Sequence, residues 1–291
     1  MAALVGFLAR SSEPSYHGHS LSEWIVPLSL ENDVPPAFRW SQGEASEALR
    51  QMGTNSFPFL LKWFTYTPTR RVKHFVWLAT SRHMPWLYRY RSFNDWMYRH
   101  DINHTKIHAA VRACHVLGPL AAPLIPALSR MAVTNRNFAQ QGYVIDAIAG
   151  IGRAALPILT KLANSDCDVT QCRALNDLKH LGTNALPLVP LLLAKLKSTN
   201  EMVAAESAAT LGYLRFEPAK VVPALAECVQ TTNETLRTWA LGALGSYGAE
   251  ARSTLPLLLE KLQDSDWFTK QYVSMAIKEI APEVLTNASP E

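Results

Sequence analysis

Proline and glycine recur together at a nearly constant spacing, and this periodicity constrains the fold more than any other feature of the chain. Among the prolines, five recur at steps of 31, 33, 33 and 33 residues: Pro126, Pro157, Pro190, Pro223 and Pro256. An apolar run ending in glycine precedes each proline, and these glycines are Gly118, Gly152, Gly182, Gly212 and Gly248. An aliphatic stretch and a short turn of Asn, Asp, Ser or Thr follow each proline. Such internal repetition is typical of repeat proteins.

Each residue type in this unit has a physical reason to stand where it does. Glycine just past a helix accepts the left-handed conformation that ends the helix. Proline is tolerated in a first helical turn, or it kinks the helix one turn further in. Asn, Asp, Ser and Thr supply N-cap oxygens to the next helix. A single helix pair cannot bury its apolar face alone, so neighbouring pairs must stack. The sequence therefore predicts an all-α fold, an α-α superhelix of about six to seven helix pairs.

The repeat resembles a known family. Residues Leu244–Asp266 carry the clearest copy, and Ala48–Lys62 carries an earlier one on the same template. This pattern is similar to HEAT repeats, especially the degenerate bacterial type, whose solenoid is armadillo-like, and the similarity covers residues 41–62 and 104–281. The resemblance implies a repeat scaffold that binds proteins and carries out no catalysis.

The repeat also suggests a domain organisation. We expect an N-terminal segment and capping helix over 1–40, a HEAT-like solenoid over 41–281 and a C-terminal tail over 282–291. The template fails over 63–107, which we expect to be irregular. The last helix pair should close the stack, with Trp267 or Phe268 folded back over the preceding repeat.

The irregular segment is both aromatic and basic. Residues 63–98 hold eleven of the 27 aromatic residues, and residues 70–112 hold nine basic against two acidic side chains. One interpretation is a surface that binds nucleic acid or another polyanion. The other, which we favour, is a bulky aromatic core with basic groups at its rim, because so many exposed aromatics would endanger solubility. The candidate polyanion-binding residues are Arg70, Arg71, Lys73, Arg82, Arg89, Arg91 and Arg99.

Motifs for catalysis or cofactors do not emerge from the sequence. His104, His108 and His115 share one helical face, but no acidic residue accompanies them on it, so we expect no metal site. No histidine is followed by Glu, and no Gly-Lys-Ser/Thr loop occurs. Gly150 and Gly242 read as small residues for close helix packing. We therefore expect no cofactor and no enzymatic activity.

The second helix of each pair offers the candidate surface for a protein partner. Its polar and aromatic side chains carry mixed charges, which suits a protein better than a polyanion. The candidates are Gln140, Gln141, Asn176, Lys179, Glu206, Arg237, Trp239 and Lys270.

The remaining features concern the compartment. We expect no membrane-spanning segment, since glycine and prolines interrupt the longest uncharged stretch. Residues 1–10 have the apolar length of a leader but no preceding basic residue, so a truncated leader, a membrane-surface helix and a docking helix stay open. Three of the four cysteines lie among apolar residues, as small hydrophobes do. A cytoplasmic location is the default expectation.

Overall fold

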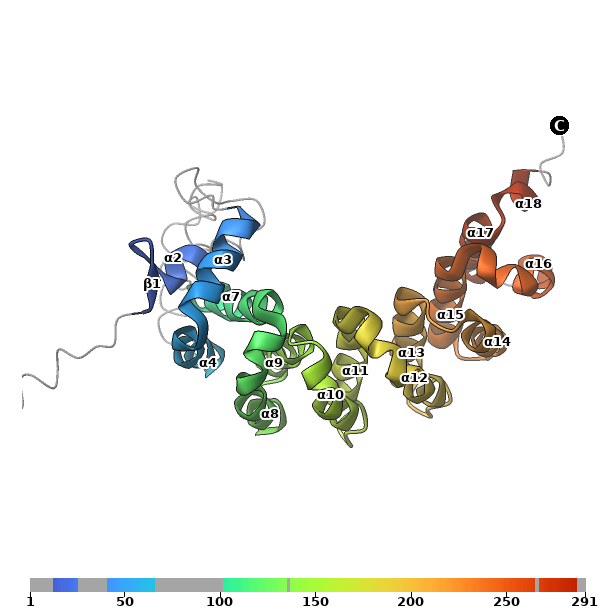
Figure 1. The fold of residues 1–291 in the computed structure, drawn as a ribbon. Coiled ribbons are helices and arrows are strands. Elements are labelled where there is room, and N and C mark those ends of the chain that lie inside the picture. The colour runs from blue at the N-terminus through green and yellow to red at the C-terminus, as the bar shows by residue number, and fades with distance from the viewer. Residues whose placement is uncertain (1–12, 26–40, 66–101, 135–136, 265–266, 287–291) are drawn as a thin grey trace, which may run out of the picture. The chain divides into compact units, whose positions relative to one another are not determined.

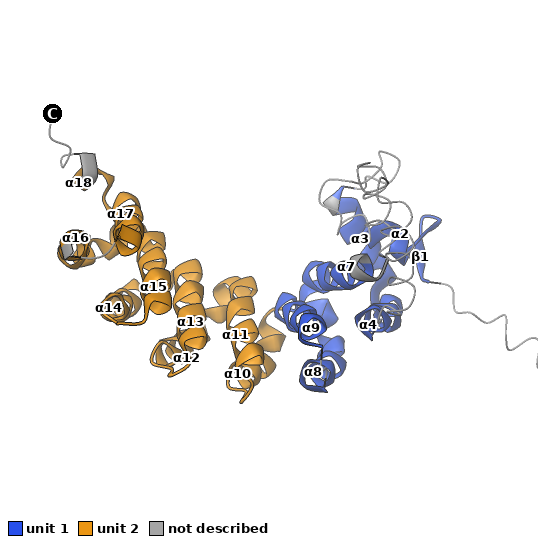
Figure 2. Cartoon of the chain, turned by 180° about the vertical axis from the view of Figure 1, so that it is seen from behind, with its two compact units in different colours: residues 1–151 blue, residues 152–291 orange. Residues whose placement is uncertain are grey.

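The computed structural model describes residues 13–25, 41–65, 102–134, 137–264 and 267–286. Their contacts divide the chain into two compact units, residues 1–151 and 152–291 (Figure 2). We expected one repeat domain over 41–281. A repeat array makes mainly nearest-neighbour contacts, so it divides readily in this way. Each unit is described by itself below.

The first unit begins with a small hairpin and a capping helix. Strands β1 (Ser15–Tyr16) and β2 (His19–Ser20) pair antiparallel and lead into helix α2 (Leu21–Ile25). The indole Nε1 of Trp24 donates to the Tyr16 carbonyl at 3.0 Å, which ties the helix to the hairpin. The next elements are α3 (Gln42–Met52), the 3₁₀ helix η3 (Gly53–Ser56) and α4 (Phe57–Thr65).

The second half of this unit contains a helix pair and the long helix before it. Its elements are α7 (Ile102–Leu117), η5 (Gly118–Leu124), α8 (Ile125–Thr134) and α9 (Phe138–Gly150). Among the described residues, one helical stretch, Lys106–Thr134, has the length and apolar composition of a membrane-crossing helix. This stretch runs through three elements, α7, η5 and α8, which have 16, 7 and 10 residues, and Gly118, at φ +52°, separates α7 from the other two. Each of these is shorter than the roughly 20 residues that a spanning helix needs.

The second unit consists of four helix pairs within its described residues (Figure 1). The first helices are α10 (Leu156–Ala163), α12 (Val189–Lys195), α14 (Pro218–Val229) and α16 (Leu255–Asp264). The second helices are α11 (Asp168–Asp177), α13 (Glu201–Leu214), α15 (Glu234–Tyr247) and α17 (Trp267–Ile280). The 3₁₀ helices η6 (Arg153–Ala155), η7 (Leu178–Leu188) and η8 (Gly248–Thr254) lie before α10, α12 and α16, and α18 (Pro282–Thr286) follows α17.

The glycine and proline pattern produces the expected local structure in most copies. The backbone has positive φ at Gly53, Gly118, Gly152, Gly182 and Gly248, so these glycines end helices as predicted. Pro58, Pro126, Pro157, Pro190 and Pro256 each stand at the second residue of a helix. The all-α HEAT-like fold is confirmed, apart from the two-residue strands of the hairpin.

The copy at Gly212 departs from the template. This glycine lies inside α13, and left-handed conformations fall instead on Arg215 and Glu217, at φ +52° and +46°. A Cβ on Gly212 would lie 2.6 Å from Cα of Ala243 on α15. The glycine therefore serves close helix packing, and Pro223 consequently lies inside α14, which begins at Pro218.

The second helices form the spine of this unit. α11, α13, α15 and α17 contact one another in series, and each first helix packs against the second helix that follows it. Buried hydroxyl groups connect neighbouring repeats: Thr210 donates to the Leu175 carbonyl at 3.0 Å, and Tyr247 donates to the carbonyls of Leu211 and Phe216 at 3.2 and 2.9 Å. Leu175, Leu225 and Leu258 are fully buried between the layers.

The C-terminal end differs from two expectations. The expected tail contains α18, and Glu283 on this helix forms an ion pair with Arg252 of η8. Neither aromatic residue at the start of α17 folds back over the preceding repeat. Trp267 is 76% exposed, and the Phe268 ring contacts Tyr272 on its own helix at 4.9 Å between centroids.

Candidate protein-interaction face

One face of the second helices in the second unit repeats in register. Asn200 caps α13 and Asn233 caps α15, each with its side-chain oxygen accepting backbone N–H groups of the first turn. The second, sixth, ninth and thirteenth residues of a helix lie on one side of it. We call this side the second-helix face; it comprises Met202, Glu206, Ala209 and Tyr213 on α13, Thr235, Trp239, Gly242 and Ser246 on α15, and Phe268, Tyr272, Met275 and Glu279 on α17.

Large apolar side chains on this face are exposed to solvent. Met202 is 53% exposed, Tyr213 65%, Trp239 49% and Met275 57%. Isolated exposed apolar residues are normal on a protein surface, but here they recur on three successive second helices, α13, α15 and α17. The equivalent positions of the preceding repeat carry Val169, Arg173 and Asn176 on α11 and His180 on η7. Val169 is 41% exposed and the other three are polar, so the exposed Tyr, Trp and Met side chains of this face lie on α13, α15 and α17.

Small residues bring these helices close together beneath the face. A Cβ on Gly245 would lie 3.4 Å from Cα of Ala276 on α17, which parallels the contact of Gly212 with Ala243. Gly245 and Gly150 thus pack closely, as small helical residues should. Gly242 was predicted to do the same, but it is exposed, and a Cβ there would meet nothing within 4 Å. Space therefore remains open beside Trp239.

Glu206 is the charged group of the face on α13. Its side chain is partly buried, and burial raises its pKa, an effect that the charge of Lys179 partly offsets. Within the described part of the chain, its carboxylate forms no hydrogen bond and no ion pair within 4.0 Å. Glu206 is thus a partly desolvated carboxylate between exposed apolar neighbours.

Two of the predicted partner-binding residues are buried. Gln140 and Gln141 on α9 are 8% and 5% exposed, so neither side chain is available to a partner. The Nε2 group of Gln141 donates to the Ala132 carbonyl at 2.7 Å and connects α9 to α8. The polar group of Gln141 thus serves an internal hydrogen bond, which residue type alone cannot distinguish from surface exposure.

The other predicted residues fall into two groups, those with contacts inside the chain and those on the second-helix face. Lys179 donates to Asn176 Oδ1 at 3.0 Å, and the Arg237 guanidinium donates to the Thr231 carbonyl at 3.0 Å, which anchors the turn before α15. Lys270 is partly buried on α17. Glu206 and Trp239 lie on the second-helix face. Sequence reasoning missed Met202, Tyr213 and Met275, because it selected polar residues, although their spacing from the N-caps was a usable signal.

The predicted polyanion-binding residues, Arg70 to Arg99, lie outside the described residues. Two aromatics at the edge of that segment are described, and both are core: Trp63 is 4% exposed and Phe64 2%. Lys106 places its ammonium 5.6 Å from the centroid of the Trp63 ring. Both aromatics therefore belong to the core, and a basic group lies over the Trp63 ring.

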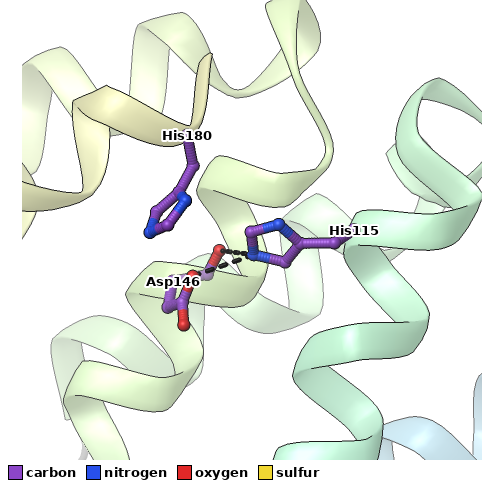
Figure 3. A group of neighbouring side chains, drawn as sticks. All are labelled: His115, Asp146 and His180. Atoms are coloured by element: carbon purple, nitrogen blue, oxygen red, sulfur yellow. Dashed lines mark hydrogen bonds and ion pairs between the residues drawn. The ribbon is translucent and has the colours of Figure 1, made fainter. Parts of the chain in front are cut away.

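The histidines of α7 contact α9 instead of one another. His115 Nε2 lies 2.8 Å from Asp146 Oδ1 and 3.2 Å from the Asp146 carbonyl (Figure 3). The ring of His108 contacts Tyr143 at 4.7 Å between centroids, and the His104 side chain is outside the described part. A Cβ on Gly150 would lie 2.4 Å from His115 Cδ2, so this glycine makes room for the imidazole. Asp146 is 31 residues from His115, so helix spacing did not reveal this acidic partner.

All four cysteines are free thiols. Burial raises the pKa of Cys114 to about 12 and that of Cys228 to about 11. Burial also raises the pKa of the half-buried Cys172. Cys167 is exposed just before α11, and hydrogen bonding with Thr170 lowers its pKa. Three thiols therefore behave as small apolar groups, and Cys167 is the accessible one.

Comparison with known proteins agrees with this architecture. Residues 189–278 match the family model of HEAT repeats. Among solved structures, the chain is similar to the crystal structure of an engineered protein, with 18% identity, coverage of 62% of this chain and 91% of that chain, and a TM-score of 0.38. No curated protein matches the chain. HEAT repeats are generally non-catalytic and typically mediate protein interactions. The family match thus extends over α12 to α17, and the same glycine and proline register recurs in earlier copies of the repeat.

Proposed function

We propose that the chain is a non-catalytic scaffold that binds a protein partner through the second-helix face of its second unit. The observation that carries this proposal is the exposure of Met202, Tyr213, Trp239 and Met275 at register positions of three consecutive helices. Tyr, Trp and Met are enriched at protein interfaces, where they supply large contact areas. The family match includes all three of these helices.

The composition of the face supports a protein partner over a polyanion. Its register positions on α13, α15 and α17 include two carboxylates, Glu206 and Glu279, and no Lys or Arg. Phosphate recognition depends on Lys and Arg to neutralise the backbone. The two carboxylates would repel the phosphates of a nucleic acid.

Site-specific photo-crosslinking in the native cell tests this proposal. p-Benzoylphenylalanine is introduced in place of Tyr213 or Met275, with Glu227 as the control position, since Glu227 is exposed on the first helix α14. We expect protein adducts from the two face positions and none from Glu227. Adding Trp239→Ala should reduce the adducts at Tyr213. Equal adducts from all three positions, or adducts that Trp239→Ala leaves unchanged, would contradict the proposal.

A further inference from the structure

Glu206 and Trp239 occupy equivalent positions on neighbouring helices. Each stands six residues after the asparagine that caps its helix, and the two are separated by one repeat of 33 residues. The close contact of Gly212 with Ala243 brings α13 and α15 together at this level of the stack. Side chains on adjacent packed helices are within reach of a single long side chain of a partner, because helix axes lie about 8–10 Å apart.

The surface next to this pair is built from the smallest side chains. Ala209 follows Glu206 by one turn, and Gly242 follows Trp239 by one turn. Open space above Gly242 leaves the neighbouring indole accessible from that side. A long, thin side chain can therefore lie over Ala209 and Gly242 with its end near the carboxylate.

The two groups together suit one chemical class. A partly desolvated carboxylate without an internal ion pair attracts a cation, and the face of an exposed indole attracts a cation through its quadrupole. We propose, on the basis of the function proposed above, that Glu206 and Trp239 jointly receive a Lys or Arg side chain of the protein partner, flanked by apolar residues that contact Met202 and Met275.

Two basic side chains of the chain itself could in principle form an ion pair with the Glu206 carboxylate. Lys179 is close enough to affect the pKa of Glu206, but its ammonium donates to Asn176. Arg173 holds the equivalent position on α11, and it forms no ion pair with Glu206 within 4.0 Å among the described residues. The carboxylate thus remains available to a partner.

Selection from a random peptide library displayed on phage tests the proposal with the purified full-length chain. We expect selected peptides to carry Lys or Arg beside Leu, Ile, Phe or Met. Glu206→Gln should weaken their binding about tenfold, since loss of a desolvated charge partner costs at least that much. Glu206→Lys should shift a new selection towards Asp and Glu. Glu227→Gln is the matched control on α14 and should leave binding unchanged.

The outcomes separate this inference from the function on which it rests. The selected peptides could need Trp239 but lack Lys and Arg, or they could bind Glu206→Gln as tightly as the native chain. Either result would contradict the proposed binding of a Lys or Arg side chain and would leave the proposed interaction face unaffected. If Trp239→Ala leaves binding unchanged, or no peptide is selected, both proposals are wrong. Circular dichroism of each variant confirms that lost binding is not lost folding.

Discussion

Helices α9 and α15 have the same cap and the same register, yet their faces are used in opposite ways. Asn137 caps α9 as Asn233 caps α15. Six residues after the cap, Tyr143 of α9 contacts the ring of His108, whereas Trp239 of α15 is 49% exposed. Near the end of each face, Gly150 of α9 packs against His115, and Ser246 of α15 is exposed.

This difference shows what the helical register fixes and what it leaves open. The register determines which side chains share a face, because the cap sets where each helix begins. Whether that face becomes packing surface depends on what the neighbouring helix brings to it. In the first unit, α7 brings two histidines that occupy the α9 face. On α13 and α15 the large apolar side chains of the corresponding face, Met202, Tyr213 and Trp239, remain exposed, which is why we propose partner binding for them.

The largest expected effect tests whether the two units lose stability independently. Leu258 on α16 is fully buried, and Leu258→Ala should lower the free energy of unfolding by about 2–5 kcal/mol through lost burial and the cavity left behind. In a repeat array, this loss should first reduce hydrogen-exchange protection in α14 to α17 and leave α7 to α9 protected. Leu259→Ala, at a position 39% exposed on the same helix, is the control and should cost much less. A uniform loss of protection in both units would reveal a single cooperative globule.

A smaller expected effect compares the stability cost of a glycine substitution on the packed face of α9 with that on the exposed face of α15. Gly150→Ala on α9 places a methyl group 2.4 Å from the His115 ring and displaces the imidazole from Asp146, so it should destabilise the fold by about 1–3 kcal/mol. Gly242→Ala on α15 meets nothing within 4 Å and should stabilise it by up to about 1 kcal/mol through higher helix propensity. Thermal or urea unfolding of the two variants measures both. Equal destabilisation would mean that the α15 face is covered after all.

Local chemistry was predictable from the sequence because it depends on residues close together in the chain. The Gly53 and Pro58 copy folds as the later copies do, with φ +52° at the glycine and proline at the second residue of α4. The resemblance to HEAT repeats, carried by this register, is confirmed by the family match. The asparagine caps of α9, α13 and α15 also follow from local sequence alone.

The remaining features depend on how each helix is rotated about its axis, which neighbours decide. Gln141 is polar yet buried, because the Ala132 carbonyl on α8 accepts its amide. Gly212 was expected to end a helix, but the approach of α15 makes it a packing residue inside α13. Trp239 was predicted as a partner-binding residue, but Met202, Tyr213 and Met275 were missed, since an apolar residue in a helix is more often core than surface.

The smallest expected effect concerns Glu206 and distinguishes a carboxylate without an ion pair in the fold from a paired one. Because burial raises its pKa in the folded chain above the ordinary value of 4.5, the ionised form costs stability at neutral pH, and that cost disappears as pH falls through the raised pKa. Glu206→Gln should therefore be slightly more stable than the native chain at pH 7, by a few tenths of a kcal/mol after solvent screening (about 1 °C in Tm), and equal to it near pH 4. Differential scanning calorimetry at both pH values measures this, with Glu227→Gln at an exposed position of α14 as the matched control substitution. If Glu206→Gln instead lowers stability at pH 7, the carboxylate is paired within the fold, as Asp146 is with His115 on α9, and the contrast between the two helices would not extend to their charged groups.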